Sequence, residues 1–500
     1  MSFESAVSAF KDQARGLIEG GVDLIVIETM IDIQEARAAL IAVKEIKDIF
    51  TIVTMTYEQD GRTLNGTDPV SALITLQSLG ADAVGCNCSL GPSGMVELIT
   101  KMKPYATVPL VAKPNAGLPK IINGETVFEM SAKQFGDVSK ALVKAGANII
   151  GGCCGTAPEH IRKLVGSVGK ITTVPPQKKS ISALSSPCEH LIIDETQPLI
   201  IIGERLNPTG KKALQEDMRS GKMASVRDIA IQQEQQGAQL LDVNVGVPNI
   251  DENQAMRSII SVLSLCAHKP LVIDSSNAKA IETALRLYPG RALLNSISGE
   301  KAKLKALLPL AKKYGAMFIM LPLTDKCLPE TAVERIKIIK DIFVQAKKYG
   351  FTKDDIIVDG ITMSIATNSL AGIETIKTIK WCADKLKIKT VLGLSNISFG
   401  MPQRAWINAS FLAMAQSAGL TMAIANPASE ELINIKLASD LLLQKDNNAT
   451  AFVKRFATTS EHKMESSSIA LLAPQEKLRK AILDGRREDI ILIIQEALQA

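Results

Sequence analysis

Short apolar runs alternate with amphipathic segments along most of the chain. The β-branched run at 23–28 (DLIVIE) predicts a strand, and apolar residues at helical spacing over 33–46 predict a helix that Asp32 caps. The strands are apolar throughout rather than alternating, which is typical of parallel sheets covered on both faces by helices. The pattern therefore predicts an α/β protein.

The strand–helix alternation occurs in two blocks. The first block contains five predicted strands, over 23–28, 51–57, 83–87, 110–113 and 148–152. The second contains eight, over 199–202, 239–243, 271–273, 292–295, 317–321, 356–358, 390–394 and 422–425. Eight units predict a complete (βα)8 barrel, whereas five predict an incomplete barrel whose sheet has two open edges. We expect two (βα)8-type barrels in tandem, the first incomplete.

Four segments follow from this pattern. Residues 1–170 form the partial barrel, and residues 171–197 are polar, contain prolines and lack a period, which predicts a linker. Residues 198–445 form the complete barrel. Residues 446–500 form a helical segment, with a helix pair expected over 474–500.

Two adjacent thiols, Cys153 and Cys154, stand where the fifth strand of the first block runs into glycines. Neighbouring strand residues face opposite ways, so both thiols can reach one point only if the backbone leaves the strand there, and the glycines permit this. Cys88 also follows a strand, at a Gly/Pro turn. Three thiolates at the ends of different strands match a catalytic zinc site with one open position. The alternative is that they are buried, inert thiols.

Cys188 and His190 have a metal-like spacing but lack further ligands nearby, so we take them to be structural or incidental.

Short polar side chains stand at or just beyond the strand ends of the second block. They include Asp242 and Asn244, Asp274, Asn295, Asp359, Asn396 and Asn426. Amides and carboxylates converging at one end of a barrel suit a flat heterocycle with alternating donors and acceptors, such as a pterin. The alternative, that each is a cap or turn residue, explains single positions but not the whole set. No His or Lys is expected among these residues.

Composition narrows the class of protein further. The net charge of +5 is modest and spread along the chain, and by itself it argues neither for nor against nucleic acid. No dense basic patch with interleaved aromatic residues is visible, so no nucleic-acid partner is expected. Neither a signal peptide nor an apolar run of about 18 residues is visible, so no membrane partner is expected. Eight cysteines in 500 residues fit free thiols in a reducing compartment, which predicts a cytoplasmic protein.

The motifs GCNCSLGP at 85–92 and GGCCGT at 151–156 resemble the zinc-dependent homocysteine methyltransferase barrel, over about residues 1–170. The resemblance implies that Cys88, Cys153 and Cys154 hold zinc, which binds the homocysteine sulfur. It also implies that Glu28 holds the homocysteine amino group. The alternative for Glu28 is a carboxylate that caps the following helix.

The second block resembles the pterin-binding domain shared by cobalamin-dependent methionine synthases and methyltetrahydrofolate–corrinoid methyltransferases, through IIGERLNPTG, LDVNVG, VIDSSN, LNSIS and VLGLSNISFG. The resemblance implies that Asp274, Asn295 and Asp359 bind the pterin and that Asn396 is catalytic, near N5. Asp242 and Asn244 should lie in or beside the same site.

Residues 446–500 resemble the start of the helical cap that precedes a cobalamin-binding domain, although a plain helical extension is an equal alternative. The corrinoid-ligand motif Asp-x-His-x-x-Gly does not occur in this sequence. Cobalamin is therefore expected from sequence or a partner outside this chain.

Both blocks together resemble the cobalamin-dependent methionine synthase family, with zinc and cobalamin as cofactors. The implied reaction is methyl transfer from 5-methyltetrahydrofolate, through a corrinoid, to homocysteine. One alternative is a methyltetrahydrofolate–corrinoid methyltransferase that uses only the second barrel. Another is a non-catalytic folate-binding module.

Overall fold

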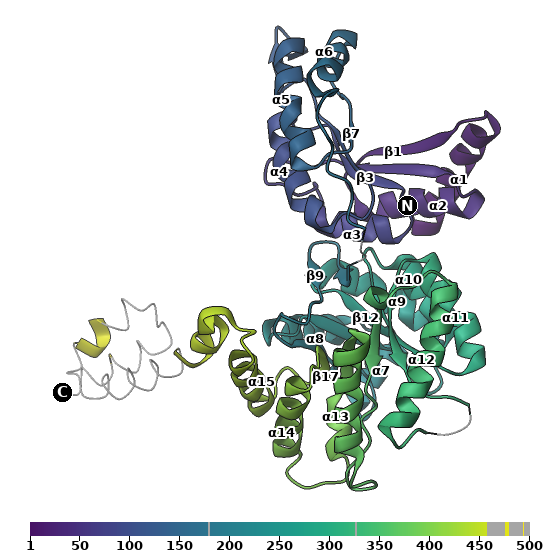
Figure 1. The fold of residues 1–500 in the computed structure, drawn as a ribbon, viewed down its shortest axis with the longest axis vertical. Coiled ribbons are helices and arrows are strands. Elements are labelled where there is room, and N and C mark those ends of the chain that lie inside the picture. Colours follow the sequence, from purple (N-terminus) through teal and green to yellow (C-terminus); the bar gives the residue numbers. More distant parts are fainter. Residues whose placement is uncertain (179–180, 326–327, 458–475, 480–493, 495–500) are drawn as a thin grey trace. The chain divides into compact units, whose positions relative to one another are not determined.

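The computed structural model describes residues 1–178, 181–325, 328–457, 476–479 and 494 (Figure 1). The chain divides into two compact units, residues 1–435 and 436–500. Apart from 476–479 and 494, the helix pair expected over 474–500 lies outside the described residues. The start of a cobalamin-domain cap, expected over 446–500, therefore stays a prediction.

The first sheet has five parallel strands in the order β1-β2-β3-β4-β7. The strands are β1 (Leu24–Met30), β2 (Phe50–Met55), β3 (Ala83–Asn87), β4 (Leu110–Lys113) and β7 (Ile149–Ile150). Helices α1 (Phe3–Glu19), α2 (Ile33–Ile46), α3 (Pro69–Ser78), α4 (Pro92–Met102), α5 (Ala132–Ala145) and α6 (Pro158–Val168) surround it. Strands β1 and β7 form the two edges of this sheet, so the first barrel is only partly formed, as predicted.

Capping residues explain where several of these helices begin. Asp32 accepts hydrogen bonds from the backbone N–H groups of Gln34 and Glu35 and so starts α2, as the sequence predicted. Asp68 caps α3 in the same way, and Ser131 begins α5 with a capping box. These caps set the chain direction after each strand and so help to fix the loops at the strand ends.

A two-stranded antiparallel hairpin, β5 (Pro119–Ile122) and β6 (Glu125–Phe128), stands apart from the main sheet. Its turn residues Asn123 and Gly124 have φ angles of 55° and 84°. Two positive φ angles in a two-residue turn are the signature of a type I′ hairpin, for which Asn-Gly is a favoured pair. The apolar pattern of the sequence did not predict this hairpin.

A second hairpin lies inside the segment that was expected to be a linker without regular structure. Its strands are β8 (Ala183–Ser185) and β9 (His190–Ile192). Leu184 and Ile193 are buried in the same cluster as inward-facing residues of the second barrel, while Ala183 packs with Val70 and Ile74 of α3. Three-residue strands are too short to give a readable period, which is why the sequence pattern missed them.

Eight parallel strands form a closed barrel between residues 200 and 425, and β10 pairs with β17 to close it (Figure 1). They are β10 (Ile200–Gly203), β11 (Leu240–Asn244), β12 (Leu271–Asp274), β13 (Leu293–Ser298), β14 (Met317–Leu321), β15 (Ile356–Asp359), β16 (Lys389–Gly393) and β17 (Met422–Ala425). The predicted α/β fold with a complete second barrel is confirmed.

Helices follow the barrel strands and cover its outside, as in other (βα)8 barrels. They are α7 (Lys212–Ser220), α8 (Ala224–Gln235), α9 (Glu252–Cys266), α10 (Ala278–Leu287), α11 (Lys301–Lys313), α12 (Ala332–Lys348), α13 (Ala371–Trp381), α14 (Arg404–Ser417) and α15 (Glu430–Leu442). None of the helices in the described part of the chain is long and apolar enough to cross a membrane.

Helix α2, which packs on the first sheet, contacts helix α10 of the barrel. The buried guanidinium of Arg37 donates hydrogen bonds to the carbonyl oxygens of Leu285 (2.9 Å) and Arg286 (3.2 Å). Arg286 forms ion pairs with Glu4 and Glu45. One hydrophobic cluster contains buried residues from both parts.

Candidate functional site

The three predicted zinc ligands lie at the carboxyl ends of two strands that flank β4. Cys88 directly follows β3, while Cys153 and Cys154 lie in the loop after β7. The segment after β4 holds both loops: the backbone N–H of Cys88 donates to the carbonyl oxygen of Lys113 (3.1 Å) and that of Cys153 to Pro114 (2.9 Å). Parallel pairing of β3, β4 and β7 therefore brings residues 65 positions apart to one edge.

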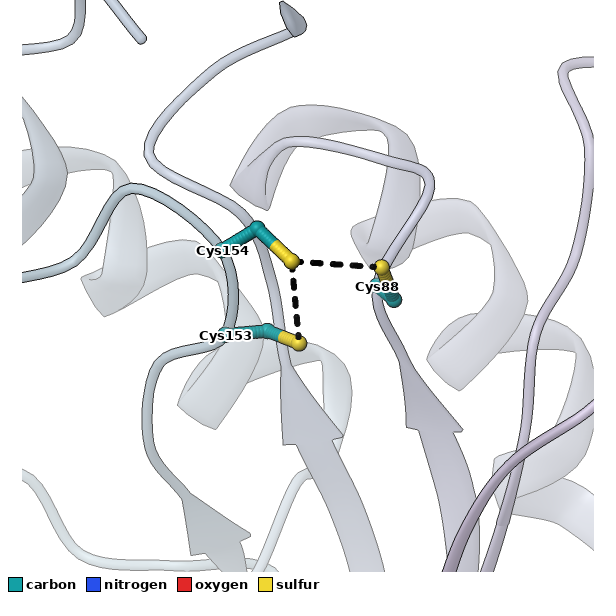
Figure 2. Close-up of side chains that lie close together, drawn as sticks. All are labelled: Cys88, Cys153 and Cys154. Carbon is teal, nitrogen blue, oxygen red and sulfur yellow. Dashed lines mark hydrogen bonds between the residues drawn. The ribbon is translucent and has the colours of Figure 1, made fainter. Parts of the chain in front are cut away.

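The three sulfurs point toward one another (Figure 2). The Sγ atoms of Cys88 and Cys154 are 3.7 Å apart, those of Cys153 and Cys154 are 4.0 Å apart, and all three lie within 4.8 Å. Tetrahedral zinc with Zn–S bonds of about 2.3 Å needs its sulfurs about 3.8 Å apart. The thiols are therefore spaced as three ligands of such a site, and too far apart for a disulfide.

Left-handed backbone conformations make this convergence possible. Cys88 and Ser89 have φ angles of 62° and 53°, and Gly155 has a φ of 77°. The sequence predicted that glycines turn the chain at the Cys153–Cys154 pair, and Gly155 does so. The turn at Cys88 is made by non-glycine residues, which adopt this region at a cost in free energy.

The thiol cluster is unfavourable for negative charge in the absence of a cation. The pKa of Cys154 is raised to about 11, first by desolvation of its sulfur and then by hydrogen bonding and charge at Cys88 and Cys153. A divalent cation reverses this preference, because it stabilises thiolates at its ligand positions. The donor set therefore suits a soft metal ion such as zinc.

Glu28 lies near the end of β1, and its carboxylate forms an ion pair with Lys113 at the end of β4. The alternative role expected for Glu28, a cap of the following helix, is wrong, because Asp32 caps α2. A role for Glu28 in binding an amino group stays a prediction. The sequence pattern did not indicate Lys113, because its contact with Glu28 joins β1 and β4, which are not neighbours in the sheet.

A cavity of about 460 Å³ opens at the carboxyl ends of the barrel strands. Its lining includes four of the predicted pterin-binding residues, Asp242, Asp274, Asn295 and Asn396. The structure thus places residues from β11, β12, β13 and the segment after β16 around one cavity, and this placement agrees with the prediction from sequence. Their role in binding a pterin stays a prediction.

Two other predicted pterin-binding residues do not line this cavity. The Asn244 amide donates a hydrogen bond to the carboxylate of Asp274 (2.8 Å), so Asn244 acts on the cavity through its neighbour. Asp359 accepts a hydrogen bond from the backbone N–H of Ile361 (2.7 Å) at the end of β15.

Burial weakens the acidity of the carboxyl groups around the cavity. Desolvation, with the neighbouring Asp274, raises the pKa of Asp242 well above its usual range. Burial also raises the pKa of Asp274, and that of Asp359 to about 6. Asp242 is 3% exposed, and Asn295 donates a hydrogen bond to it (3.3 Å). The pair can present one protonated and one ionised carboxyl, which offers both a donor and acceptors to a ligand.

The expectation that no lysine lies among the residues of this site is wrong. Lys211 lines the cavity, together with Glu204 and Arg205. Its ammonium group donates to the carbonyl oxygens of Arg205 (2.9 Å) and Asn207 (3.0 Å), and burial lowers its pKa. The loop after β10 folds back toward the barrel, so a residue eight positions beyond the strand reaches the cavity. The polar residues predicted for this site lie at or just beyond strand ends, and Lys211 lies too far along the loop to be among them.

Cys188 and His190 do not join a metal cluster. His190 Nδ1 lies 2.9 Å from the carboxylate of Asp68, and the carbonyl oxygen of Cys188 accepts a hydrogen bond from Arg62. Within the described ranges, Cys88, Cys153 and Cys154 form the one group of three or more His, Cys, Asp or Glu residues placed to hold a metal ion.

Two family matches cover most of the sequence. Residues 1–168 match the homocysteine S-methyltransferase family, and residues 203–426 match the pterin binding enzyme family. The thiol cluster lies within the first range, and the cavity at the barrel end lies within the second.

Two curated relatives match along almost the whole chain. Methionine synthase of Mycobacterium tuberculosis is 27% identical over 98% of this chain, and that of Mycobacterium leprae is likewise 27% identical over 98%. The chain spans 44% of the length of each of these relatives.

A solved structure of dihydropteroate synthase from Clostridium difficile aligns with 51% of this chain and all of its own, at 19% identity and a TM-score of 0.40. From the family matches and the two curated relatives, the chain contains a homocysteine S-methyltransferase domain followed by a pterin-binding domain, and it resembles methionine synthase over nearly all of its length.

Proposed function

We propose that this chain transfers the methyl group of 5-methyltetrahydrofolate, through a corrinoid, to homocysteine, forming methionine and tetrahydrofolate. The observation that carries the proposal is the convergence of three thiols within 4.8 Å of one another in a homocysteine S-methyltransferase domain. The carboxylate- and amide-lined cavity in the pterin-binding domain supports the folate half of the reaction.

In this proposal Cys88, Cys153 and Cys154 hold Zn²⁺, and homocysteine provides the fourth sulfur. When bound, zinc would lower the pKa of the homocysteine thiol, so that a nucleophilic thiolate exists at neutral pH. The three cysteines fix the position of that sulfur at the strand ends. Glu28 would bind the homocysteine amino group, which requires that it exchange its ion pair with Lys113 for one with the substrate.

The pterin would be held by Asp274, Asp242 and Asn295, with Asp359 and Asn244 as further contacts or supports. An ionised Asp274 can accept two hydrogen bonds from the N–C–N edge of the ring, a bidentate arrangement that fixes its orientation. In the described part of the chain, no hydrogen-bond partner is seen for the side-chain amide of Asn396, so this amide is available to N5 of the folate. A hydrogen bond there would stabilise a protonated N5 as the methyl group leaves.

The corrinoid would be bound by sequence or a partner protein outside this chain, since the corrinoid-ligand motif Asp-x-His-x-x-Gly does not occur in this sequence. The corrinoid supplies the carrier atom that accepts and donates the methyl group. We also propose a cytoplasmic location, where a reducing environment keeps the three thiols free. Nucleic acid and membrane are not proposed as partners.

A second candidate is a methyltetrahydrofolate–corrinoid methyltransferase that uses only the pterin-binding domain. One observation favours it: the second barrel is closed by eight strands, while the first sheet has five strands and two open edges. This candidate predicts folate-dependent methyl transfer without any reaction of homocysteine.

The two half-reactions can be measured separately with the purified chain. In Cys153→Ser we expect loss of the bound zinc and a decrease of about 100-fold or more in methyl transfer from added methylcobalamin to homocysteine, because one of three ligands is gone. Methyl transfer from 5-methyltetrahydrofolate to added cob(I)alamin should stay within about twofold of the wild-type rate. In Asn396→Ala the pattern should reverse, with a loss of about 100-fold in the folate reaction only.

Metal analysis of the same samples decides between the candidates. Retention of zinc in Cys153→Ser, or a zinc-loaded wild-type chain that does not methylate homocysteine, would contradict the methionine-forming reaction. Folate-dependent transfer without the homocysteine reaction would support the second candidate. Folate binding without either reaction would indicate a non-catalytic module.

A further inference from the structure

The side chain of Asn87 is fully buried between the carboxyl ends of three strands. Its Oδ1 accepts hydrogen bonds from the backbone N–H of Thr29 (2.9 Å) and the hydroxyl of Thr54 (2.7 Å). Its Nδ2 donates to the hydroxyl of Thr29 (2.7 Å) and to the sulfur of Cys153 (3.8 Å). One amide therefore connects β1, β2 and the loop that carries two of the thiols.

The orientation of this amide follows from its partners. The backbone N–H of Thr29 can only donate, so the oxygen of Asn87 must face it. With the oxygen fixed, the NH2 group faces Thr29 Oγ1 and Cys153 Sγ, and all four hydrogen-bonding positions of the side chain have partners. A rotated amide would place its NH2 group against the Thr29 N–H donor.

The two hydrogen bonds that the Asn87 NH2 group donates act on different parts of the thiol site. Thr29 has a φ of 63°, an unfavourable conformation for a β-branched residue, and Asn87 binds both its N–H and its hydroxyl. This holds the end of β1, where Glu28 lies. The second N–H points at Cys153, and among the described residues Asn87 provides the one side-chain amide that donates to a sulfur of the three-thiol cluster.

We propose that Asn87 is a positioning residue of the metal centre, which orients the Cys153 thiolate and stabilises its charge through an N–H···S hydrogen bond. The inference rests on the proposed function, because it assumes that the three thiols bind a metal ion. Groups that hydrogen-bond to metal ligands orient them and adjust their charge, and their loss typically costs 10–100-fold in metal affinity. Asn87 also keeps Glu28 near the same site through Thr29.

Asn87→Asp is the most direct test, since it keeps the shape and an acceptor oxygen but replaces the N–H donor with a second acceptor. We expect the zinc dissociation constant, measured by chelator competition, to rise by about 10–100-fold. Thr56→Val is the matched control, because the Thr56 hydroxyl donates to the backbone carbonyl of Asn87 (3.0 Å) and does not touch its amide. Its zinc dissociation constant should change by less than about threefold.

Cobalt substitution separates this role from a purely structural one. In the Co²⁺-loaded chain, loss of a hydrogen bond to sulfur raises the energy of the sulfur lone pairs. The sulfur-to-cobalt charge-transfer band of Asn87→Ala should therefore move to longer wavelength, and that of Thr56→Val should not move. An unchanged band together with unchanged zinc affinity in folded Asn87→Asp and Asn87→Ala would overturn the proposal.

A measurement on the wild-type chain covers the case in which neither variant folds. With ¹¹³Cd bound and asparagine ¹⁵N-labelled, a scalar coupling between the metal and the Asn87 side-chain proton would reveal the N–H···S contact. Absence of this coupling, with cadmium bound by the three thiols, would also overturn the proposal. If the wild-type chain binds no metal at these thiols, the proposed function is wrong. If the thiols bind metal and substitution of Asn87 does not change this binding, only the present inference is wrong.

Discussion

The buried carboxyl group of Asp359 is costly to ionise in the folded protein. Asp359 lies at the end of β15, where burial raises its pKa to about 6, and the hydrogen bond from the Ile361 N–H and the charge of Arg335 offset only part of this effect. An ordinary aspartate has a pKa near 3.9. The folded protein therefore binds a proton at Asp359 more tightly than the unfolded chain does.

The raised pKa of Asp359 makes the stability of the protein depend on pH. Between about pH 4 and pH 6 the folded state holds more protons at this position, so the free energy of unfolding falls as pH rises and levels off above pH 6. In Asp359→Asn the decrease in the free energy of unfolding should be smaller by on the order of 2 kcal/mol, a value that allows for the partial exposure of the Asp359 side chain. Urea unfolding of the ligand-free protein from pH 4 to 7 measures it.

Asp384→Asn provides the control for this measurement, because Asp384 forms an exposed ion pair with Lys380. It should keep the wild-type dependence on pH. Equal slopes for the wild type and Asp359→Asn would show that Asp359 ionises in the folded protein as it does in the unfolded chain.

For single residues, the sequence allowed the convergence of Cys88, Cys153 and Cys154 to be predicted, because each thiol lies just beyond the end of a recognisable strand. The contacts of Asn87 and Lys113 could not be predicted in the same way. Asn87 reaches Thr29 across β2, and Lys113 reaches Glu28 across two strands. Such contacts depend on the curvature of the sheet, which a pattern of apolar residues does not encode.

Among the secondary-structure elements, the main strands and helices followed from their apolar patterns, and two hairpins did not. Both strands of the β5–β6 hairpin are largely exposed, so they lack the alternation that marks a half-buried strand. The Asn123-Gly124 pair was nevertheless a usable turn signal. The hairpin matters for the site, because Phe128 at its end lies against the loop that carries Cys153 and Cys154.

Gly155 tests that packing. A Cβ atom at Gly155 would lie 2.3 Å from Phe128 Cγ, and its φ of 77° disfavours any other residue. We expect Gly155→Ala to lower the free energy of unfolding by about 1–3 kcal/mol and to weaken zinc binding, since the loop must move to relieve the contact. Thermal unfolding and chelator competition measure the two effects.

Gly166→Ala is the matched control in the helix that follows. A Cβ atom there meets nothing within 4 Å, and alanine favours a helix interior over glycine. This variant should be more stable by up to about 1 kcal/mol and bind zinc as the wild type does. A Gly155→Ala protein with wild-type stability and zinc affinity would mean that the loop adapts without cost.

Across residues 1–435, the two domains share one hydrophobic cluster and a buried polar contact. Arg37 is 1% exposed and donates to carbonyl oxygens at the end of α10, and burial lowers its pKa to about 10. The last carbonyl groups of a helix lack partners within the helix, so Arg37 satisfies groups that would otherwise be buried unpaired. Stability of the first domain should therefore be linked to that of the second.

Arg37→Met tests this linkage with a side chain of similar length. We expect it to lower the free energy of unfolding by about 2–3 kcal/mol, because buried carbonyl groups lose their donor. Both tryptophans, Trp381 and Trp406, lie in the pterin-binding domain, so their fluorescence follows that domain alone. The fluorescence midpoint in urea should fall although the substitution lies in the other domain.

Arg15→Met removes an exposed arginine that pairs with Asp12 and should change the midpoint very little. If Arg37→Met shifts the far-UV circular dichroism but leaves the tryptophan midpoint unchanged, the two domains unfold independently.

The three residues of β8 serve both domains at once, and this limits how the protein can be cut into pieces. Ala183 packs against α3, while the next residue, Leu184, packs among the inward-facing side chains of the barrel strands. The segment before the barrel is thus packed against both domains and is not a flexible linker. A fragment meant to hold only the pterin-binding domain should therefore begin before β8, because a cut at the first barrel strand, β10, would remove Leu184 from the buried cluster that it shares with the barrel strands.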